Sequence, residues 1–110
     1  MSVTKKRMDR KVQRYPVRLS LHELSSRPAP DSYLVDISSL GAQMETPQFM
    51  ALNSPVEFVV RFPWSEKETK LSGLVKWIKP LIGKPGRFRL GLRFFNPFWE
   101  LDMLARQGKL

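Results

Sequence analysis

The stretch "RFRLGLRF", residues 87–94, has the most regular alternation of apolar and polar residues in the chain. Its apolar positions, which alternation places on one side, are Phe88, Leu90, Leu92 and Phe94. Its other positions are Arg87, Arg89, Gly91 and Arg93. Because successive side chains of an extended chain point to opposite faces, this period of two predicts a strand with one face on a core.

Five further segments on the N-terminal side of this strand have strand character. They are residues 15–23, 31–37, 42–46, 55–62 and 70–78. In the fourth of them Val56, Phe58, Val60 and Phe62 are predicted to face inward. Gly73 in the fifth predicts a bulge or bend, and "SSRPAP" (25–30) is predicted to be a loop.

The C-terminal segment changes period. Asn96 and Pro97 predict a helix start, with Asn as N-cap and Pro at the first helical position. Apolar residues then recur at helical spacing, which predicts a helix over residues 97–106. The fold class is therefore mainly β: six antiparallel strands in a small barrel or sandwich, with a short C-terminal helix packed on it. Trp77 and Phe94 are assigned to the core, and Trp99 to helix packing.

Composition and charge limit the classes of partner. The chain has 110 residues, no cysteine, and 19 basic against 10 acidic residues, for a net charge of +9. The charge favours an anionic partner, and the absence of cysteine excludes disulfides and thiolate metal sites. No segment approaches the ~18 apolar residues of a membrane span. We therefore expect a cytoplasmic protein with no membrane insertion.

The N-terminal segment, residues 1–14, is polar and basic without periodicity. It is predicted to be a flexible arm, followed by one domain over residues 15–110. Arg10 and Arg14 lie four residues apart, directly before the first strand. Such an arm is either a solvated tail or a ligand-binding element, because the guanidinium fork can bond guanine O6 and N7 or a phosphate bidentately.

The stretch "DISSLG" (36–41) also has two interpretations. Asp36 and Ser38 can cap a turn in which Gly41 takes a positive φ. Alternatively, the Asp36 carboxylate is an acceptor for the N1–H and N2–H₂ donors of guanine, and the glycine lets backbone approach a ligand. The arm and this stretch are then complementary, since one supplies donors and the other an acceptor.

Catalysis is not indicated. A Ser38, Asp36 and His22 triad can be written down, but it lacks a strand-to-helix nucleophile elbow. The sequence has no carboxylate pair of catalytic type, no metal-ligand spacing and no glycine-rich phosphate loop. We predict a protein that is not an enzyme and has no cofactor.

The two motifs together resemble the PilZ domain family, whose signatures are RxxxR and, about two strands later, D/N-x-S-x-x-G. The segments "GLVKWIK" (73–79) and "RLGLRFFNP" (89–97) are similar to later strands of that family. The resemblance implies a six-stranded β-barrel and the second messenger cyclic di-GMP as ligand. Carried over by position, the binding residues are Arg10, Arg14, Asp36, Ser38 and Gly41. Candidate secondary contacts are Arg7, Asp9, Gly91 and Arg93.

Three functions are compatible with these observations. The first is a cyclic di-GMP receptor that signals by ordering its arm and changing its contacts with an unidentified effector protein. The second is a basic barrel that binds RNA or single-stranded DNA, which is disfavoured because Phe58, Phe62, Phe88 and Phe94 are predicted to face inward. The third is a PilZ-like adaptor that binds no nucleotide, against which the intact motifs argue.

Overall fold

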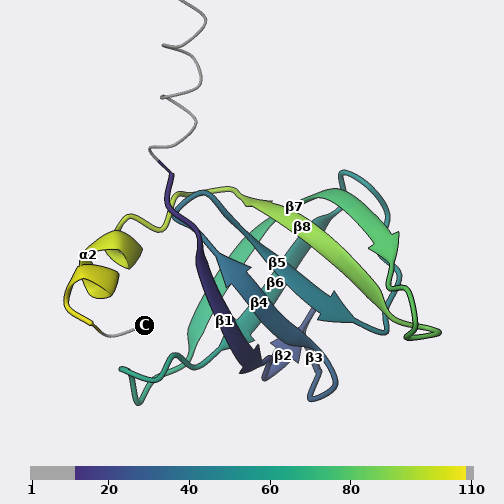
Figure 1. Cartoon of the computed structure of the whole chain (residues 1–110), viewed down its shortest axis with the longest axis horizontal. Helices are drawn as coiled ribbons and strands as arrows, with labels where there is room; N and C mark the ends of the chain where they lie inside the picture. Colours follow the sequence, from purple (N-terminus) through teal and green to yellow (C-terminus); the bar gives the residue numbers. More distant parts are fainter. Residues whose placement is uncertain (1–11, 109–110) are drawn as a thin grey trace, which may run out of the picture.

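The computed structural model describes residues 12–108 and has the expected mainly β fold, with one short helix after the strands (Figure 1). The strands are β1 (Tyr15–Ser20), β2 (Glu23–Leu24), β3 (Arg27–Pro28), β4 (Tyr33–Ile37), β5 (Gly41–Thr46), β6 (Pro55–Val60), β7 (Thr69–Pro80) and β8 (Phe88–Phe94). The helix is α2 (Glu100–Arg106). No helix among residues 12–108 has the length and apolar character needed to cross a membrane.

The strands form one antiparallel sheet in the order β1-β4-β5-β8-β7-β6-β2-β3. The chain connects the two sides of this sheet where it passes from β1, at one edge, to β2, next to the other edge. The Leu21 amide donates to the Ser32 carbonyl beside β4, and the next amide, that of His22, donates to the Val59 carbonyl of β6, each at 2.8 Å. Because neighbouring residues bond beside β4 and on β6, which lie toward opposite ends of the sheet, the sheet must curl, as Figure 1 shows.

The number of strands differs from the predicted six. The first predicted strand is divided into β1 and β2, and β3 lies inside the predicted loop 25–30. Ser25 and Ser26 join β2 to β3 with φ values of 55° and 69°. Two consecutive positive φ values are what a two-residue hairpin turn requires. Neither serine is a residue that signals this turn as Asn-Gly does, so the sequence pattern indicated only a loop.

The helix begins later than predicted. It starts at Glu100 with Trp99 as N-cap, and no side chain caps it. The Phe98 amide instead donates to the Ser39 carbonyl at 2.7 Å, and the Phe98 ring lies 6.0 Å from that of Phe62. Asn96 and Pro97 therefore lie in the connection that carries Phe98 onto the barrel, and the predicted Asn96 cap is wrong.

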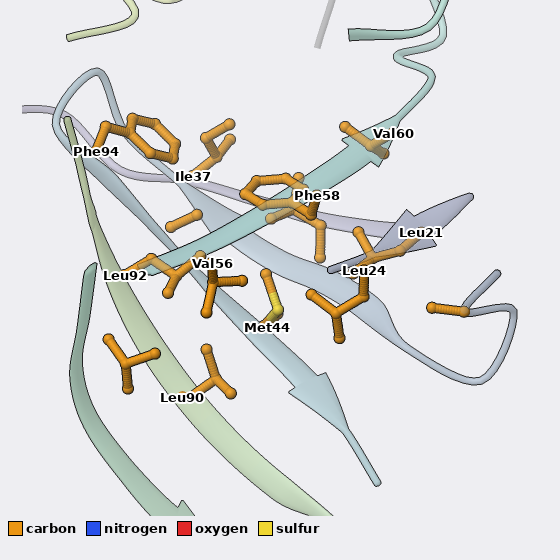
Figure 2. Packing of buried hydrophobic residues seen from close by; sticks show 14 of the residues in the cluster. Leu21, Leu24, Ile37, Met44, Val56, Phe58, Val60, Leu90, Leu92 and Phe94 are labelled. Carbon is orange, nitrogen blue, oxygen red and sulfur yellow. The ribbon is translucent and has the colours of Figure 1, made fainter. Parts of the chain in front are cut away.

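The core fills the inside of the curled sheet (Figure 2). All four inward positions predicted for β6 and its continuation are buried, as are Leu90, Leu92 and Phe94 of β8. Leu101 is the buried residue of α2 and belongs to the same core cluster. Trp99, in contrast, is largely exposed, so its assignment to helix packing is wrong.

Gly73 does not form the predicted bulge. It pairs regularly with Val56 of β6 and Phe94 of β8, and the register of β7 against β8 shifts further on, between Val75 and Trp77. A Cβ atom at position 73 would lie 2.2 Å from the Arg93 carbonyl oxygen. The glycine is needed for close approach of the two strands, and the bulge is at Lys76.

Candidate ligand site at the β4–β5 turn

The turn between β4 and β5 is held by Ser38. Its amide donates to the Gly41 carbonyl at 2.8 Å, and its Oγ lies 3.2 Å from the amide nitrogens of both Leu40 and Gly41, from which it accepts hydrogen bonds. The side chain is buried. The Ser38 Oγ also donates to the Gly41 carbonyl at 3.3 Å. In this structure Ser38 therefore has the turn-forming role, and its hydroxyl can donate to a ligand only by giving up that bond.

Gly41 does not have the positive φ that the turn interpretation expected of it. The glycines with positive φ are Gly83, Gly86 and Gly108. Its Cα instead lies against β8, where a Cβ atom would be 2.1 Å from the Leu92 carbonyl oxygen. Any other residue would push β5 away from β8 at this point. Gly41 thus positions the turn against the sheet rather than shaping the turn itself.

Arg14 and Asp36 form an ion pair, here called the open pair. Arg14 lies directly before β1, and Asp36 lies after a β4 bulge, opposite Pro16 of β1 and Gln43 of β5. The Arg14 Nη1 atom is 3.2 Å from the Asp36 Oδ1 atom, and the side chains are 60% and 22% exposed. The donor and the acceptor that were predicted to hold guanine therefore contact each other, at a position that solvent reaches.

Arg14 of the open pair lines a cleft of about 350 Å³ on the outer face of the sheet, whereas Asp36 is not one of its lining residues. Its walls come from the segment before β1, the β4–β5 turn, and β7 and β8. The residues that supply charge or an aromatic surface to these walls are Arg14, Lys76, Trp77 and Arg93. A volume of this size falls at the lower end of the ~300–1,000 Å³ usual for small-molecule sites.

Trp77 is the site residue that the sequence pattern misplaced. Alternation from Val75 assigned it to the core, but the bulge between Val75 and Trp77 reverses the alternation, so Ile78 packs against the core and Trp77 lies outside. Its indole covers Gly91: a Cβ atom there would be 2.3 Å from the indole Nε1 atom. The space that Gly91 was expected to leave for a ligand is thus filled by the indole, which lines the cleft.

The other predicted residues are placed as follows. Arg93 is exposed and lines the cleft beside Gly91. Arg7, Asp9 and Arg10 lie outside the described residues. His22 contacts Glu68 and takes no part in this site.

A second group of charges surrounds Glu45 on β5 and is here called the Glu45 cluster. Glu45 lies two residues beyond Gln43, the β5 residue that pairs with Asp36. The Glu45 side chain is only 3% exposed and is surrounded by Arg87 at 2.8 Å, Lys84 at 3.5 Å and Arg18 at 3.7 Å. Arg87 also donates to the Asp31 carbonyl, and the guanidinium carbons of Arg18 and Arg87 lie 4.4 Å and 5.9 Å from the centroid of the Tyr33 ring. Burial alone would raise the pKa of Glu45, but the Arg87 hydrogen bond and the three positive charges outweigh it and lower the pKa.

Comparison with known proteins identifies the family signature. The sequence model of the PilZ domain family matches residues 8–101 of this chain. Among solved structures, that of the Bacillus subtilis inhibitor of motility MotI/DgrA is similar in fold, with a TM-score of 0.66 and 13% sequence identity. The alignment covers 89% of this chain and 50% of that one, so this chain spans about half of the MotI/DgrA structure. No curated protein sequence matches this one.

Proposed function

We propose that this chain, which belongs to the PilZ domain family, is a receptor for cyclic di-GMP that binds the nucleotide in the cleft beside the open pair. PilZ domains are generally binding and adaptor domains, which agrees with the prediction of a protein without enzymatic activity.

One observation carries the proposal: Arg14, Lys76, Trp77 and Arg93 line one cleft, and Asp36 adjoins it through its ion pair with Arg14. Arg14 can donate to guanine O6 and N7 or to phosphate, and Asp36 can accept from N1–H and N2–H₂. The indole of Trp77 offers a half-exposed face on which a base can stack, worth about 1–3 kcal/mol per base. Arg93 and Lys76 supply positive charge for the phosphates.

Binding requires the open pair to exchange partners. An exposed ion pair contributes about 0.2–1 kcal/mol to stability, so parting it costs little. A charge-assisted hydrogen bond to a ligand contributes about 1.5–3 kcal/mol. Replacing the Arg14–Asp36 contact by two such bonds is therefore favourable. The pair holds both side chains near the cleft until the nucleotide arrives.

The output of binding is a change in the segment before β1. Arg10 belongs to the arm predicted from the sequence, whereas Asp36 belongs to the barrel, so a ligand that contacts both draws the arm onto the barrel. Fixing each backbone residue costs about 1–2 kcal/mol, which limits the affinity. The newly ordered surface near residues 7–14 is what an effector protein would read. Amide exchange with and without ligand tests this step: the arm should gain protection while β6 and β8 change little.

The nucleic-acid alternative lacks a stacking surface among the residues that were considered for it. Phe58, Phe62 and Phe94 are buried in the core, and Phe88 packs edge-on against Phe49. Among residues 12–108, Trp77 is the one aromatic residue that lines the cleft, whereas proteins that bind single strands stack successive bases on several aromatics. These positions favour a small nucleotide over a polynucleotide.

Calorimetry with cyclic di-GMP at physiological salt tests the proposal, with GMP and a short mixed-sequence RNA as controls. We expect a dissociation constant in the micromolar range or below, about −8 kcal/mol, with much weaker binding of both controls. Absence of heat with millimolar cyclic di-GMP and folded protein would show that this chain is an adaptor that binds no nucleotide.

A further inference from the structure

The turn between β7 and β8 carries a side chain that the barrel does not use. Ile82 in this turn is 100% exposed. The turn lies at the end of the molecule away from α2 (Figure 1). The turn is nonetheless well formed: the Leu81 amide donates to the Arg87 carbonyl at 2.9 Å, and the Arg87 amide donates to the Lys84 carbonyl at 3.1 Å. The backbone thus holds the isoleucine in water, where an apolar side chain gains nothing for the fold.

A second exposed apolar residue lies at the base of the same hairpin. Phe49 is 68% exposed, and its ring lies 5.7 Å from that of Phe88, which pairs with Pro80 at the end of β7. Ile82 and Phe49 therefore belong to the same end of the β7–β8 hairpin. We call residues 80–87 together with Phe49 the hairpin tip.

The charged residues at and beside the hairpin tip are mainly basic. From Thr69 to Trp99 the chain has no Asp or Glu and seven basic residues. Of these, Lys79, Lys84, Arg87 and Arg89 lie at or beside the hairpin tip, whereas Lys70, Lys76 and Arg93 lie further along β7 and β8. Glu45 of the neighbouring strand offsets part of the charge of Lys84 and Arg87, while Lys79 is exposed and has no acidic residue among its hairpin neighbours. The tip is thus apolar at its end and basic along its sides.

We propose that the hairpin tip docks on an anionic phospholipid surface. A fully exposed side chain on a convex turn is buried by a protein only if that protein supplies a matching pocket, whereas a lipid interface deforms around it. Apolar residues then enter the headgroup region while flanking lysines and arginines attract anionic lipids, each worth about fivefold in binding. The sequence predicted no membrane insertion, whereas this peripheral contact would insert one turn into the headgroup region. The contact does not depend on nucleotide binding.

Vesicle binding tests the proposal. The protein should sediment with phosphatidylcholine vesicles that contain phosphatidylglycerol and not with phosphatidylcholine alone. Ile82→Ser should weaken this binding by about tenfold, because the variant loses most of the apolar surface that the isoleucine would bury in the lipid. Lys79→Gln should weaken it by about fivefold. Met103→Ser on α2 and Lys70→Gln at the start of β7 are matched controls and should have no effect.

The absence of cysteine allows a direct measurement of depth. Ile82→Cys, labelled with an environment-sensitive fluorophore, should brighten and shift to the blue on anionic vesicles, and Met103→Cys should not. Failure to bind anionic vesicles would overturn the proposal and leave an acidic protein as the partner of this basic surface. Binding without a change at position 82 would also overturn it, since adsorption would then be purely electrostatic.

Discussion

Two carboxylates on the outer face of the barrel are bound by arginine, and they differ in almost every other respect. Glu45 is buried and contacts three cations, whereas Asp36 is partly exposed and contacts Arg14. The two sites lie close together, because Asp36 pairs with Gln43, two residues before Glu45 on β5. The same pair of residue types thus serves a closed arrangement at one position and an open one at the other.

The difference lies in what each arginine would lose on leaving. Arg87 bonds both Glu45 and the Asp31 carbonyl, and its departure would leave a buried carboxylate short of partners. Breaking such a buried contact costs several kcal/mol. Arg14 would leave behind a carboxylate that water can reach, so its departure costs little. We infer that the Glu45 cluster stabilises the fold, whereas the open pair is the contact that we propose to be exchanged for a ligand.

The largest expected effect is on stability. Glu45→Gln removes a buried negative charge from among three cations and should lower the free energy of unfolding by about 2–3 kcal/mol. For a domain of this size that is about 8–20 °C in Tm. Thermal unfolding followed by circular dichroism measures it, and cyclic di-GMP affinity should stay unchanged. A large loss of affinity in a folded Glu45→Gln variant would mean that the two sites are not separate.

The pH dependence of the same comparison has a definite sign. The pKa of Glu45 in the folded protein lies below its ordinary value of 4.5. Its contribution to stability is therefore fully present above about pH 4.5 and is lost as the pH falls through the lowered pKa. The stability gap between wild type and Glu45→Gln should be constant near neutrality and shrink in that acidic window. A gap that widens on acidification would contradict the lowered pKa.

The next largest effect is on binding. Arg14→Ala should weaken cyclic di-GMP binding at least tenfold, because it removes charge-assisted bonds worth more than the ~1.4 kcal/mol of one decade. Arg18→Ala is a matched control, since Arg18 lies on β1 and contacts Glu45 rather than the cleft. Calorimetry on both variants measures the difference. Equal losses in the two would indicate a diffuse electrostatic attraction.

Asp36→Ala should also weaken binding, by somewhat less than Arg14→Ala. The variant is more positive, so an unspecific polyanion site would bind more tightly after the change. A specific acceptor for guanine donors predicts the opposite. Titration of this variant with cyclic di-GMP and with RNA separates the two, and tighter binding of cyclic di-GMP would favour the nucleic-acid function.

The smallest effect is that of the open pair on stability. Arg14→Ala and Asp36→Ala should each change the free energy of unfolding by less than about 1 kcal/mol, as for other exposed pairs. Urea denaturation is accurate enough to compare them with Glu45→Gln. A loss as large as that of Glu45→Gln would show that the open pair is also part of the structural framework.

Much of the barrel could be predicted from the sequence, because its strands have one buried face and therefore alternate. Val56, Phe58 and Val60 of β6 and Leu90, Leu92 and Phe94 of β8 follow this rule. Phe88 does not follow it, because it is only partly buried and packs against Phe49. The hairpin of β2 and β3 could not be predicted, since each strand is two residues long and its serines adopt positive φ without a sequence signal. The late start of α2 has a similar cause: a contact of Phe98 with the barrel, remote in sequence, prevails over a local helix signal.

The ligand site remains a prediction, but part of its arrangement can be compared with the sequence. Motif spacing selected Arg14 and Asp36, and the structure brings these two side chains into contact. Trp77 was assigned to the wrong face because a single bulge at Lys76 reverses the alternation, and nothing in "GLVKWIK" signals a bulge there. The Glu45 cluster was missed because its members come from separate strands and a turn, so only the strand register brings them together.

The most direct test of the account is to observe the arginine side chains during titration. Nitrogen-15 NMR of the guanidinium groups, with cyclic di-GMP added to saturation, reports Arg14 and Arg87 in the same sample. The account predicts that the Arg14 Nε–H resonance shifts and becomes protected from exchange as it leaves Asp36 for the nucleotide, while the Arg87 resonance stays in place beside Glu45. An unchanged Arg14 resonance at saturation, or a shift of Arg87 in its stead, would contradict it.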